Sequence, residues 1–258
     1  MMMRLLFGTL RVSCWSTIAT AAVIVSNQSF VERARAVAPP KAESPKPTLP
    51  ANLREVNIWT RALGTTKMPA PWRVAPCDSK SKAPLLCVYD RDTLIGTVEM
   101  GTFLLSSRSD LKKNLTDAGI PAKANYADPQ YRSRVVTALK AWVNDYYATF
   151  KKDRAAEYGT TIAFTAQPPT QVTIGKLTGL RYGFAGLRQN KDIHEQHIGY
   201  VAFDGSTLYV ITTAFDAASE TGKFKTLQDF QRFEPQLTKL LPKLQLPIAA
   251  ITQPAPKR

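Results

Sequence analysis

The chain has 258 residues and carries 34 Lys and Arg against 20 Asp and Glu, which gives a formal net charge of +14. This excess favours anionic partners, either an anionic membrane surface or an acidic protein of a membrane complex. Nucleic acid is not expected, because the basic residues are scattered along the chain and no nucleic-acid-binding signature accompanies them.

Residues 1–38 have the features of an export signal. Arg4 and Arg11 form a basic start, residues 12–25 are mostly apolar, and small residues at 34–38 suit a signal peptidase. The apolar run is shorter than the roughly 18 residues of a spanning helix, which favours cleavage. An N-terminal membrane anchor is the alternative. We therefore expect an exported protein, located in a periplasm, in a thylakoid lumen or outside the cell.

The rest of the chain divides by composition into three parts. Residues 39–53 are rich in proline and charge and predict a disordered linker, and residues 248–258 predict a disordered tail. Residues 54–247 are enough for a single domain with its own core. Cleavage after residue 38 would leave 30 basic and 19 acidic residues, a net charge of +11. We expect a monomer.

Two cysteines, Cys77 and Cys87, remain after such cleavage. An even pair in an exported chain predicts a disulfide, which would clamp the entry to a strand and contribute about 2–3 kcal/mol. The wide spacing disfavours a redox or metal-binding pair.

In the first half of the domain, residues 85–89 and 93–105 predict a β-hairpin, because both are apolar and β-rich and a short polar turn joins them. A small helix is expected from about Asp110 to Gly119. The clearest helix runs from about Gln130 to Glu157. Its apolar residues recur every three and four positions, including the aromatic residues Trp142, Tyr146, Tyr147 and Phe150, which this spacing assigns to the core.

The second half of the domain changes to a β pattern and ends in a helix. Strands are expected at residues 160–166, 172–177, 180–187, 197–203 and 207–215, with a tight turn at Asp204–Gly205. The last helix covers about residues 227–244, and Pro235 should kink or restart it. Short connections make most of the strand pairs antiparallel. The plan is therefore α+β, an antiparallel β-sheet flanked by helices.

The segment from Gly179 to Gly186, the segment from His197 to Thr213 and the terminal amphipathic helix resemble the end of PsbP-like domains, the family of an extrinsic photosystem II subunit. The resemblance covers about residues 130–245. It implies an α/β/α sandwich and a non-enzymatic role at a membrane complex on the lumenal side.

The sequence contains no recognisable catalytic or metal motif. His194 and His197 lie three residues apart in a strand-like segment, whereas zinc-binding histidines of the zincin type lie four apart on a helix. No metal site, cofactor or catalytic residue is therefore expected. Asp90, Asp92 and Glu99 are candidate acidic residues, but turn positions explain the two aspartates better.

We therefore expect an exported, non-enzymatic binding or accessory protein. Its candidate docking surface combines the basic face of the long helix with a strand edge, through Lys140, Lys151, Lys152, Arg154, Arg181, His197 and Tyr200. A charged helix face that is simply solvated is the plainer explanation. The alternatives for function are a structural envelope component and a secreted hydrolase that uses His197 with Glu195 or Asp216.

Overall fold

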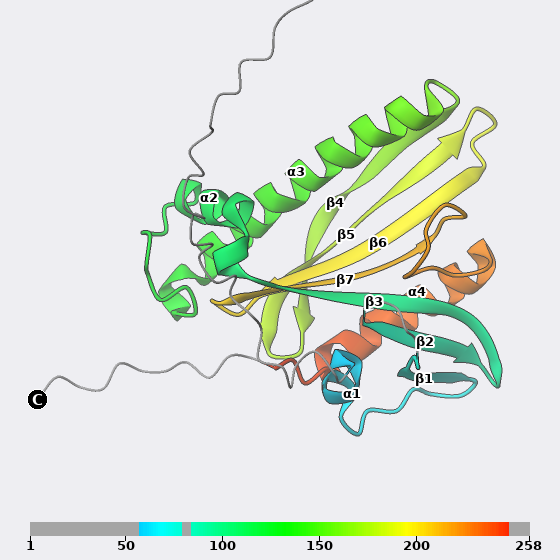
Figure 1. The fold of residues 1–258 in the computed structure, drawn as a ribbon, viewed down its shortest axis with the longest axis horizontal. Coiled ribbons are helices and arrows are strands. Elements are labelled where there is room, and N and C mark those ends of the chain that lie inside the picture. Colours follow the sequence, from blue (N-terminus) through cyan, green and yellow to red (C-terminus); the bar gives the residue numbers. More distant parts are fainter. Residues whose placement is uncertain (1–56, 79–83, 248–258) are drawn as a thin grey trace, which may run out of the picture. The chain divides into compact units, whose positions relative to one another are not determined.

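A computed structural model describes residues 57–78 and 84–247 (Figure 1). The predicted signal peptide, the proline-rich linker and the C-terminal tail lie outside these ranges and stay predictions. In the two described ranges, no helix is both long enough and apolar enough to cross a membrane.

One antiparallel sheet holds every strand of the described chain, in the order β1-β2-β3-β7-β6-β5-β4. The strands are β1 (Trp72–Pro76), β2 (Leu85–Asp90), β3 (Thr93–Leu104), β4 (Ile162–Ile174), β5 (Leu177–Arg188), β6 (Ile193–Phe203) and β7 (Thr207–Phe215). The helices are α1 (Ile58–Leu63), α2 (Ser109–Asp117), α3 (Arg132–Tyr158) and α4 (Leu227–Leu240).

Helices cover both faces of the sheet, so each face has its own core (Figure 1). On one face, α2 and α3 pack over β4, β5 and β6. On the other, α1 and α4 enclose a core that includes Trp59, Phe230 and Phe233. Successive strand residues point to opposite faces, which is why β6 sends Val201 to the α3 side and Tyr200 to the α4 side. The predicted α+β class is confirmed.

The long helix α3 forms where its apolar stripe predicts. A short 3₁₀ turn, Pro129–Tyr131, precedes it, and the Asp128 carboxylate accepts a hydrogen bond from the Gln130 amide there. The helix ends at Gly159, whose φ of 58° lies in the left-handed region that glycine adopts at low cost.

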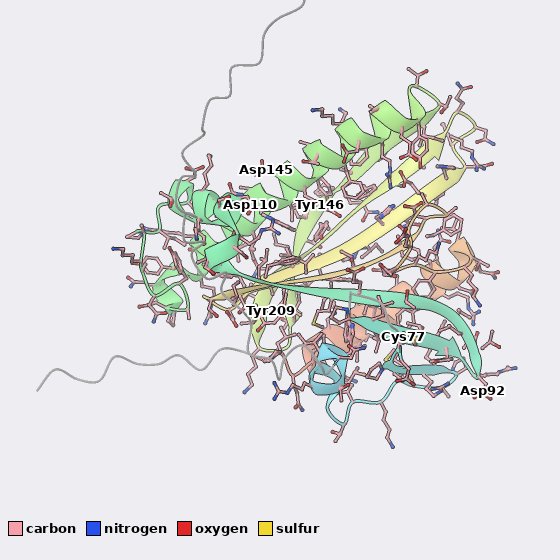
Figure 2. The ribbon with its side chains drawn as sticks, viewed as in Figure 1. Cys77, Asp92, Asp110, Asp145, Tyr146 and Tyr209 are labelled. Carbon is pink, nitrogen blue, oxygen red and sulfur yellow. A yellow bond between two sulfur atoms is a disulfide. The ribbon has the colours of Figure 1, made fainter. Side chains whose placement is uncertain are left out.

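Polar contacts fix α2 against α3 (Figure 2). The Trp142 indole Nε1 donates to Asp110 Oδ2 at 2.9 Å, and the Asn114 amide donates to Asp145 Oδ2 at 3.3 Å. Hydrogen bonding from Arg108 lowers the pKa of Asp110 to about 2, so this carboxylate stays charged at neutral pH. These contacts set the position of the aromatic residues further along α3.

The structure corrects three details of the predicted elements. The strands expected at residues 160–166 and 172–177 are one strand, β4, interrupted by a bulge between Gln167 and Thr170. β4 is an edge strand, so Pro168 and Pro169 deprive it of no ladder partner. The helix α4 does not restart at Pro235 but runs through this exposed residue from Leu227 to Leu240. Sequence patterns also did not indicate α1 and β1.

The disulfide between Cys77 and Cys87 is present, as predicted (Figure 2). It joins the end of β1 to the middle of β2, and Cys77 N donates to the Leu85 carbonyl oxygen at 2.9 Å. The Asn57 side chain caps α1 and donates to the same carbonyl at 2.8 Å. The bridge therefore fastens the short outer strand and the first helix to the sheet.

Candidate ligand pocket and buried charge network

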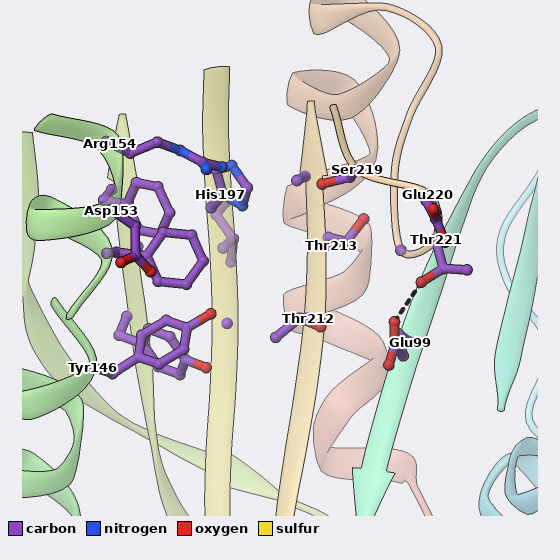
Figure 3. Close-up of a pocket in the computed structure, with 18 residues that line it drawn as sticks. Glu99, Tyr146, Asp153, Arg154, His197, Thr212, Thr213, Ser219, Glu220 and Thr221 are labelled. Atoms are coloured by element: carbon purple, nitrogen blue, oxygen red, sulfur yellow. Dashed lines mark hydrogen bonds between the residues drawn. The ribbon is translucent and has the colours of Figure 1, made fainter. Parts of the chain in front are cut away.

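A pocket of about 330 Å³ opens beside α3 (Figure 3). The helix α3 packs mainly on β4, β5 and β6, and the loop of residues 216–222 lies beside β3 and β7, where Gly222 and Thr221 contact Ala214 and Glu99. The pocket lies between that loop and the helix, above the sheet. Its lining residues come from α3, from four strands and from the loop. These residues lie in five separate segments of the sequence.

Aromatic side chains form the helix side of the pocket. Tyr146 and Phe150 lie four residues apart on α3 and therefore point the same way. Their ring centroids are 4.7 Å apart, and the Phe150 ring lies 4.6 Å from that of Phe184 on β5. Both α3 residues are only half-buried, so the predicted core stripe is exposed at this point.

Tyr182 forms part of the pocket floor by lying across β6. A Cβ atom on Gly199 would stand 2.1 Å from Tyr182 Cζ and 2.4 Å from its hydroxyl oxygen, so only glycine leaves room for this ring. The Tyr182 side chain is 2% exposed, and its hydroxyl has no hydrogen-bond partner among the described residues. Burial raises its pKa well above the ordinary value, so the hydroxyl keeps its proton.

A second tyrosine and a carboxylate face the same space. The Tyr146 hydroxyl points away from α3 toward Thr212 (Figure 3). Burial raises the pKa of Tyr146 to about 12, and the negative charge of Glu99 adds to this. Glu99 Oε2 accepts a hydrogen bond of 2.8 Å from Thr221 Oγ1 in the covering loop. The pocket thus combines aromatic surface with tyrosine hydroxyls and the half-buried carboxylate of Glu99.

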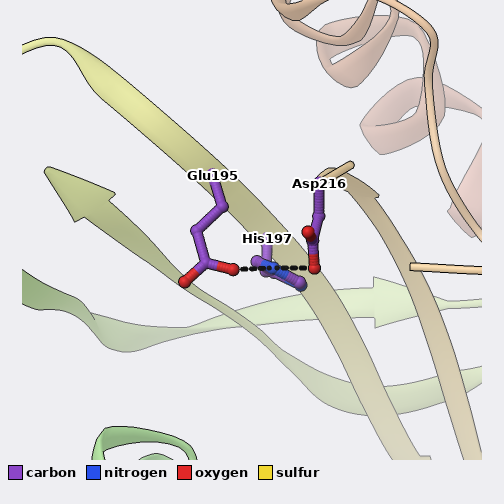
Figure 4. Close-up of side chains that lie close together, drawn as sticks. All are labelled: Glu195, His197 and Asp216. Carbon is purple, nitrogen blue, oxygen red and sulfur yellow. Dashed lines mark hydrogen bonds and ion pairs between the residues drawn. The ribbon is translucent and has the colours of Figure 1, made fainter. Parts of the chain in front are cut away.

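Four charged side chains, Glu195, His197, Asp216 and Arg154, form a network at one end of the pocket, and Figure 4 shows the first three of them. His197 Nε2 lies between two carboxylates, 3.1 Å from Glu195 Oε2 and 3.3 Å from Asp216 Oδ2. Arg154 reaches in from α3, with Nε 2.8 Å from Glu195 Oε1 and a terminal nitrogen 3.2 Å from Asp216 Oδ2. Glu195 is 1% exposed and Asp216 is 5% exposed.

The network favours the charged form of every member. Burial alone would lower the pKa of His197, but hydrogen bonds to Asp216 and Glu195 outweigh it and raise that pKa. Burial would likewise raise the pKa values of Glu195 and Asp216. Hydrogen bonds from His197, from Arg154 to Glu195, and from the Ala218 amide to Asp216 reverse this and lower both.

Two cations therefore face two buried carboxylates, and their charges balance. One ligand atom each from Glu195, His197 and Asp216 lies within 4.8 Å of the others, which is close enough for a metal ion. The Arg154 guanidinium, however, already donates to both carboxylates. Ser219 donates to Asp216 Oδ2 at 3.0 Å and makes no contact with His197 that would activate its hydroxyl. The arrangement suits the anchoring of α3, β6 and the loop to one another.

The predicted docking residues do not form one surface. Lys140, Lys151 and Lys152 are exposed on α3, whereas Arg154 on the same helix is turned inward into the charge network. The sequence did not distinguish Arg154 from the neighbouring lysines, because its two partners are far away in the chain. Glu195 and Asp216 lie 41 and 62 residues further along.

The remaining three candidates lie on two faces of the sheet. His197 is on the α3 side, whereas Tyr200 is fully buried on the α4 side, with its hydroxyl 3.0 Å from Thr238 Oγ1. Arg181 is also on the α4 side, where it pairs with Glu234 at 3.1 Å. The strand β6 is interior to the sheet, so no strand edge exists at His197.

The other residues considered from sequence are also separated. His194 contacts Arg188 and the Tyr158 ring and does not join the network. Asp90 pairs with Arg232 at 3.1 Å, whereas Glu99 lines the pocket and has no ion pair within the described residues. Sequence reasoning missed Tyr182 as a site residue, because its free hydroxyl depends on Gly199 in the neighbouring strand. A glycine opposite a tyrosine is a usable signal only once strand register is known.

No family model matches the chain, and no curated protein matches it. The solution structure of cyanobacterial PsbP (CyanoP) from Synechocystis sp. PCC 6803 is similar over 69% of this chain and 83% of that chain, with 7% sequence identity and a TM-score of 0.34. The resemblance of residues 130–245 to PsbP-like domains is thus matched by a weak structural likeness, which carries no inference about function.

Proposed function

We propose that the chain is an exported, non-enzymatic binding protein that takes a small ligand in the pocket beside α3. The observation that carries this proposal is Tyr182, a residue of the pocket lining whose buried hydroxyl has no partner among the described residues. A buried polar group without a partner costs about 1–3 kcal/mol, and a ligand that pairs with it would recover that cost. The disulfide supports an oxidising, exported location.

The state of the charged groups supports binding over hydrolysis. A histidine acts as a general base only when it is neutral, whereas Glu195 and Asp216 favour the protonated form of His197. Both carboxylates are engaged by Arg154 as well. The network is therefore better suited to holding the pocket wall than to removing a proton from a substrate.

A variant with a filled pocket tests this proposal. Thr212→Phe adds an aromatic ring to the pocket lining, and Thr165→Phe adds the same bulk at an exposed position of β4. The two variants and the parent protein would be screened by thermal unfolding against cationic, anionic and neutral small molecules. A ligand present at 100 times its Kd stabilises by about 2.7 kcal/mol, which raises Tm by roughly 5–10 °C at this size.

We expect such shifts for the parent protein and for Thr165→Phe, and none for Thr212→Phe. Equal shifts in all three proteins would place binding elsewhere. If no compound of any class shifts the parent protein, the proposal fails.

A second candidate function, docking on an anionic membrane surface, is favoured by the exposed lysines Lys140, Lys151 and Lys152. None of the three has an ion pair within the described residues. Replacing all three with glutamine is expected to weaken binding to phosphatidylglycerol vesicles by about two orders of magnitude at low salt.

The matched control removes the same charge from exposed lysines on other segments, Lys67, Lys176 and Lys225. Vesicle flotation would measure both variants. Equal losses would mean that the total charge binds lipid without a defined surface on α3.

A further inference from the structure

The pocket beside α3 is acidic although the chain as a whole is strongly basic. Three lining residues carry carboxylates, namely Glu99, Asp153 and Glu220. The cations in the lining, Arg154 and His197, are offset by the two carboxylates of the network behind them. The lining therefore keeps an excess of negative charge.

The three carboxylates differ in burial and therefore in how strongly each can attract a charged ligand. Asp153 and Glu220 are exposed at the rim, where solvent and salt screen them. Glu99 is half-buried in β3, where it lines the pocket beside Thr212, its register partner in β7. The Thr221 hydroxyl donates a hydrogen bond to Oε2 of Glu99. The other oxygen, Oε1, has no partner among the described residues. Glu99 is thus the group best placed to pair with a ligand.

The other walls suit a cation that carries an apolar body. The rings of Tyr146 and Phe150 supply aromatic surface, and aromatic rings attract cations through their π electrons. The hydroxyl oxygens of Tyr146 and Tyr182 are able to accept hydrogen bonds from an ammonium group. At about 330 Å³, the pocket lies at the lower end of the roughly 300–1,000 Å³ typical of ligand sites.

We infer that the pocket binds a small organic cation, an amine with an aromatic or short aliphatic body, whose ammonium group pairs with Glu99 and with the Tyr182 hydroxyl. This inference rests on the proposed binding function and names the class of ligand. It runs against the expectation from net charge alone, which favours anionic ligands.

Three compounds of the same size but different charge test the inference by titration calorimetry: benzylamine, benzyl alcohol and benzoate. We expect benzylamine to bind at least about tenfold more tightly than benzyl alcohol, because a hydrogen bond to a charged group is stronger than one between neutral groups. Benzoate should bind most weakly. Tighter binding of benzoate or benzyl alcohol would overturn the inference while leaving the proposed binding function intact.

Substitutions locate the effect within the pocket. Glu99→Gln keeps an acceptor for Thr221 and removes the charge, so it should reduce the affinity for benzylamine at least about tenfold and abolish the preference over benzyl alcohol. Asp153→Asn, at the exposed rim, should change it less than about threefold. Equal effects of the two substitutions, or none from Glu99→Gln, would overturn the inference.

Two tyrosine variants separate a ligand contact from a structural role. Tyr182→Phe removes the hydroxyl that has no partner, so it should weaken benzylamine binding and leave Tm unchanged or raised. The Tyr147 hydroxyl donates to the Gln167 carbonyl at 2.7 Å and accepts from Gly183 N at 2.9 Å, and Tyr147 itself does not line the pocket. Tyr147→Phe should therefore lower Tm without changing affinity. Unchanged benzylamine affinity in Tyr182→Phe would remove that hydroxyl from the proposed site.

Discussion

Replacing Arg154 with methionine is expected to lower the free energy of unfolding by about 3–5 kcal/mol. Arg154 is the cation shared by Glu195 and Asp216, and without it one of these buried carboxylates keeps a charge that nothing offsets. Removing one partner from a buried ion pair is costly for this reason, even where the intact pair adds little net stability. Chemical denaturation at constant pH measures the effect.

Two further variants show whether charge balance is the cause. Lys151→Met removes a cation one helical turn away at an exposed position, and should change stability by less than about 0.5 kcal/mol. Combining Arg154→Met with Glu195→Gln leaves one carboxylate for His197 and should recover part of the loss. If the double substitution is as unstable as the sum of the single ones, lost packing would explain the effect of Arg154 better than lost charge.

Stability should pass through a maximum between about pH 4.5 and pH 6.5 because of the same network. The pKa of His197 is raised, so its contribution is complete below its unfolded value of about 6.5 and is lost as pH rises through the folded value. The pKa values of Glu195 and Asp216 are lowered, so their contributions are present above about pH 4.5 and are lost as pH falls. Arg154, the cation that faces both carboxylates from α3, keeps its charge throughout this range.

The variant His197→Gln isolates the alkaline part of this profile. It should be about 3 kcal/mol less stable than the parent protein at pH 6, because hydrogen bonds from a charged donor to two carboxylates are lost. Between pH 6.5 and 8.5 its stability should stay nearly constant while that of the parent protein falls. His194 remains as the matched histidine outside the network. A parallel fall in both proteins would show that His197 does not cause the alkaline loss.

The network also connects stability with the pocket. Asp216 begins the covering loop, where its carboxylate accepts hydrogen bonds from the Ala218 amide and the Ser219 hydroxyl. Arg154 belongs to α3, one turn beyond Phe150 in the pocket wall. The four charged groups therefore hold both sides of the pocket at one end. Substitutions in the network should be compared with pocket variants only after their stability has been measured.

Local sequence patterns were sufficient for most of the elements. The apolar stripe of α3 repeats every three and four residues, and the hairpin turns at Asp90–Asp92 and Asp204–Gly205 separate β-rich segments. Such patterns depend on residues close together in the chain, so they can be recognised without the fold. The cysteine pair was predictable because thiols become oxidised in exported proteins, and Cys77 and Cys87 are the two cysteines outside the predicted export signal.

The errors in the predicted elements concern the edge strand β4 and the short elements α1 and β1. The gap between the strands predicted at residues 160–166 and 172–177 contains Pro168 and Pro169, yet β4 continues past them because it lies at the edge of the sheet, where a missing donor has no ladder partner. The short elements α1 and β1 contain too few residues to show a period. They are fixed by contacts with distant parts of the chain, such as that between Trp72 and Phe233.

The sequence by itself determined the fold class, the disulfide and the long helix, because each follows from local spacing or from the compartment that the predicted export signal implies. Only the tertiary structure decided the site. Arg154 pairs with residues 41 and 62 positions away, and the Tyr182 hydroxyl has no partner because Gly199 of the neighbouring strand makes room for its ring. Such relations arise from strand register and helix placement, so no local pattern contains them.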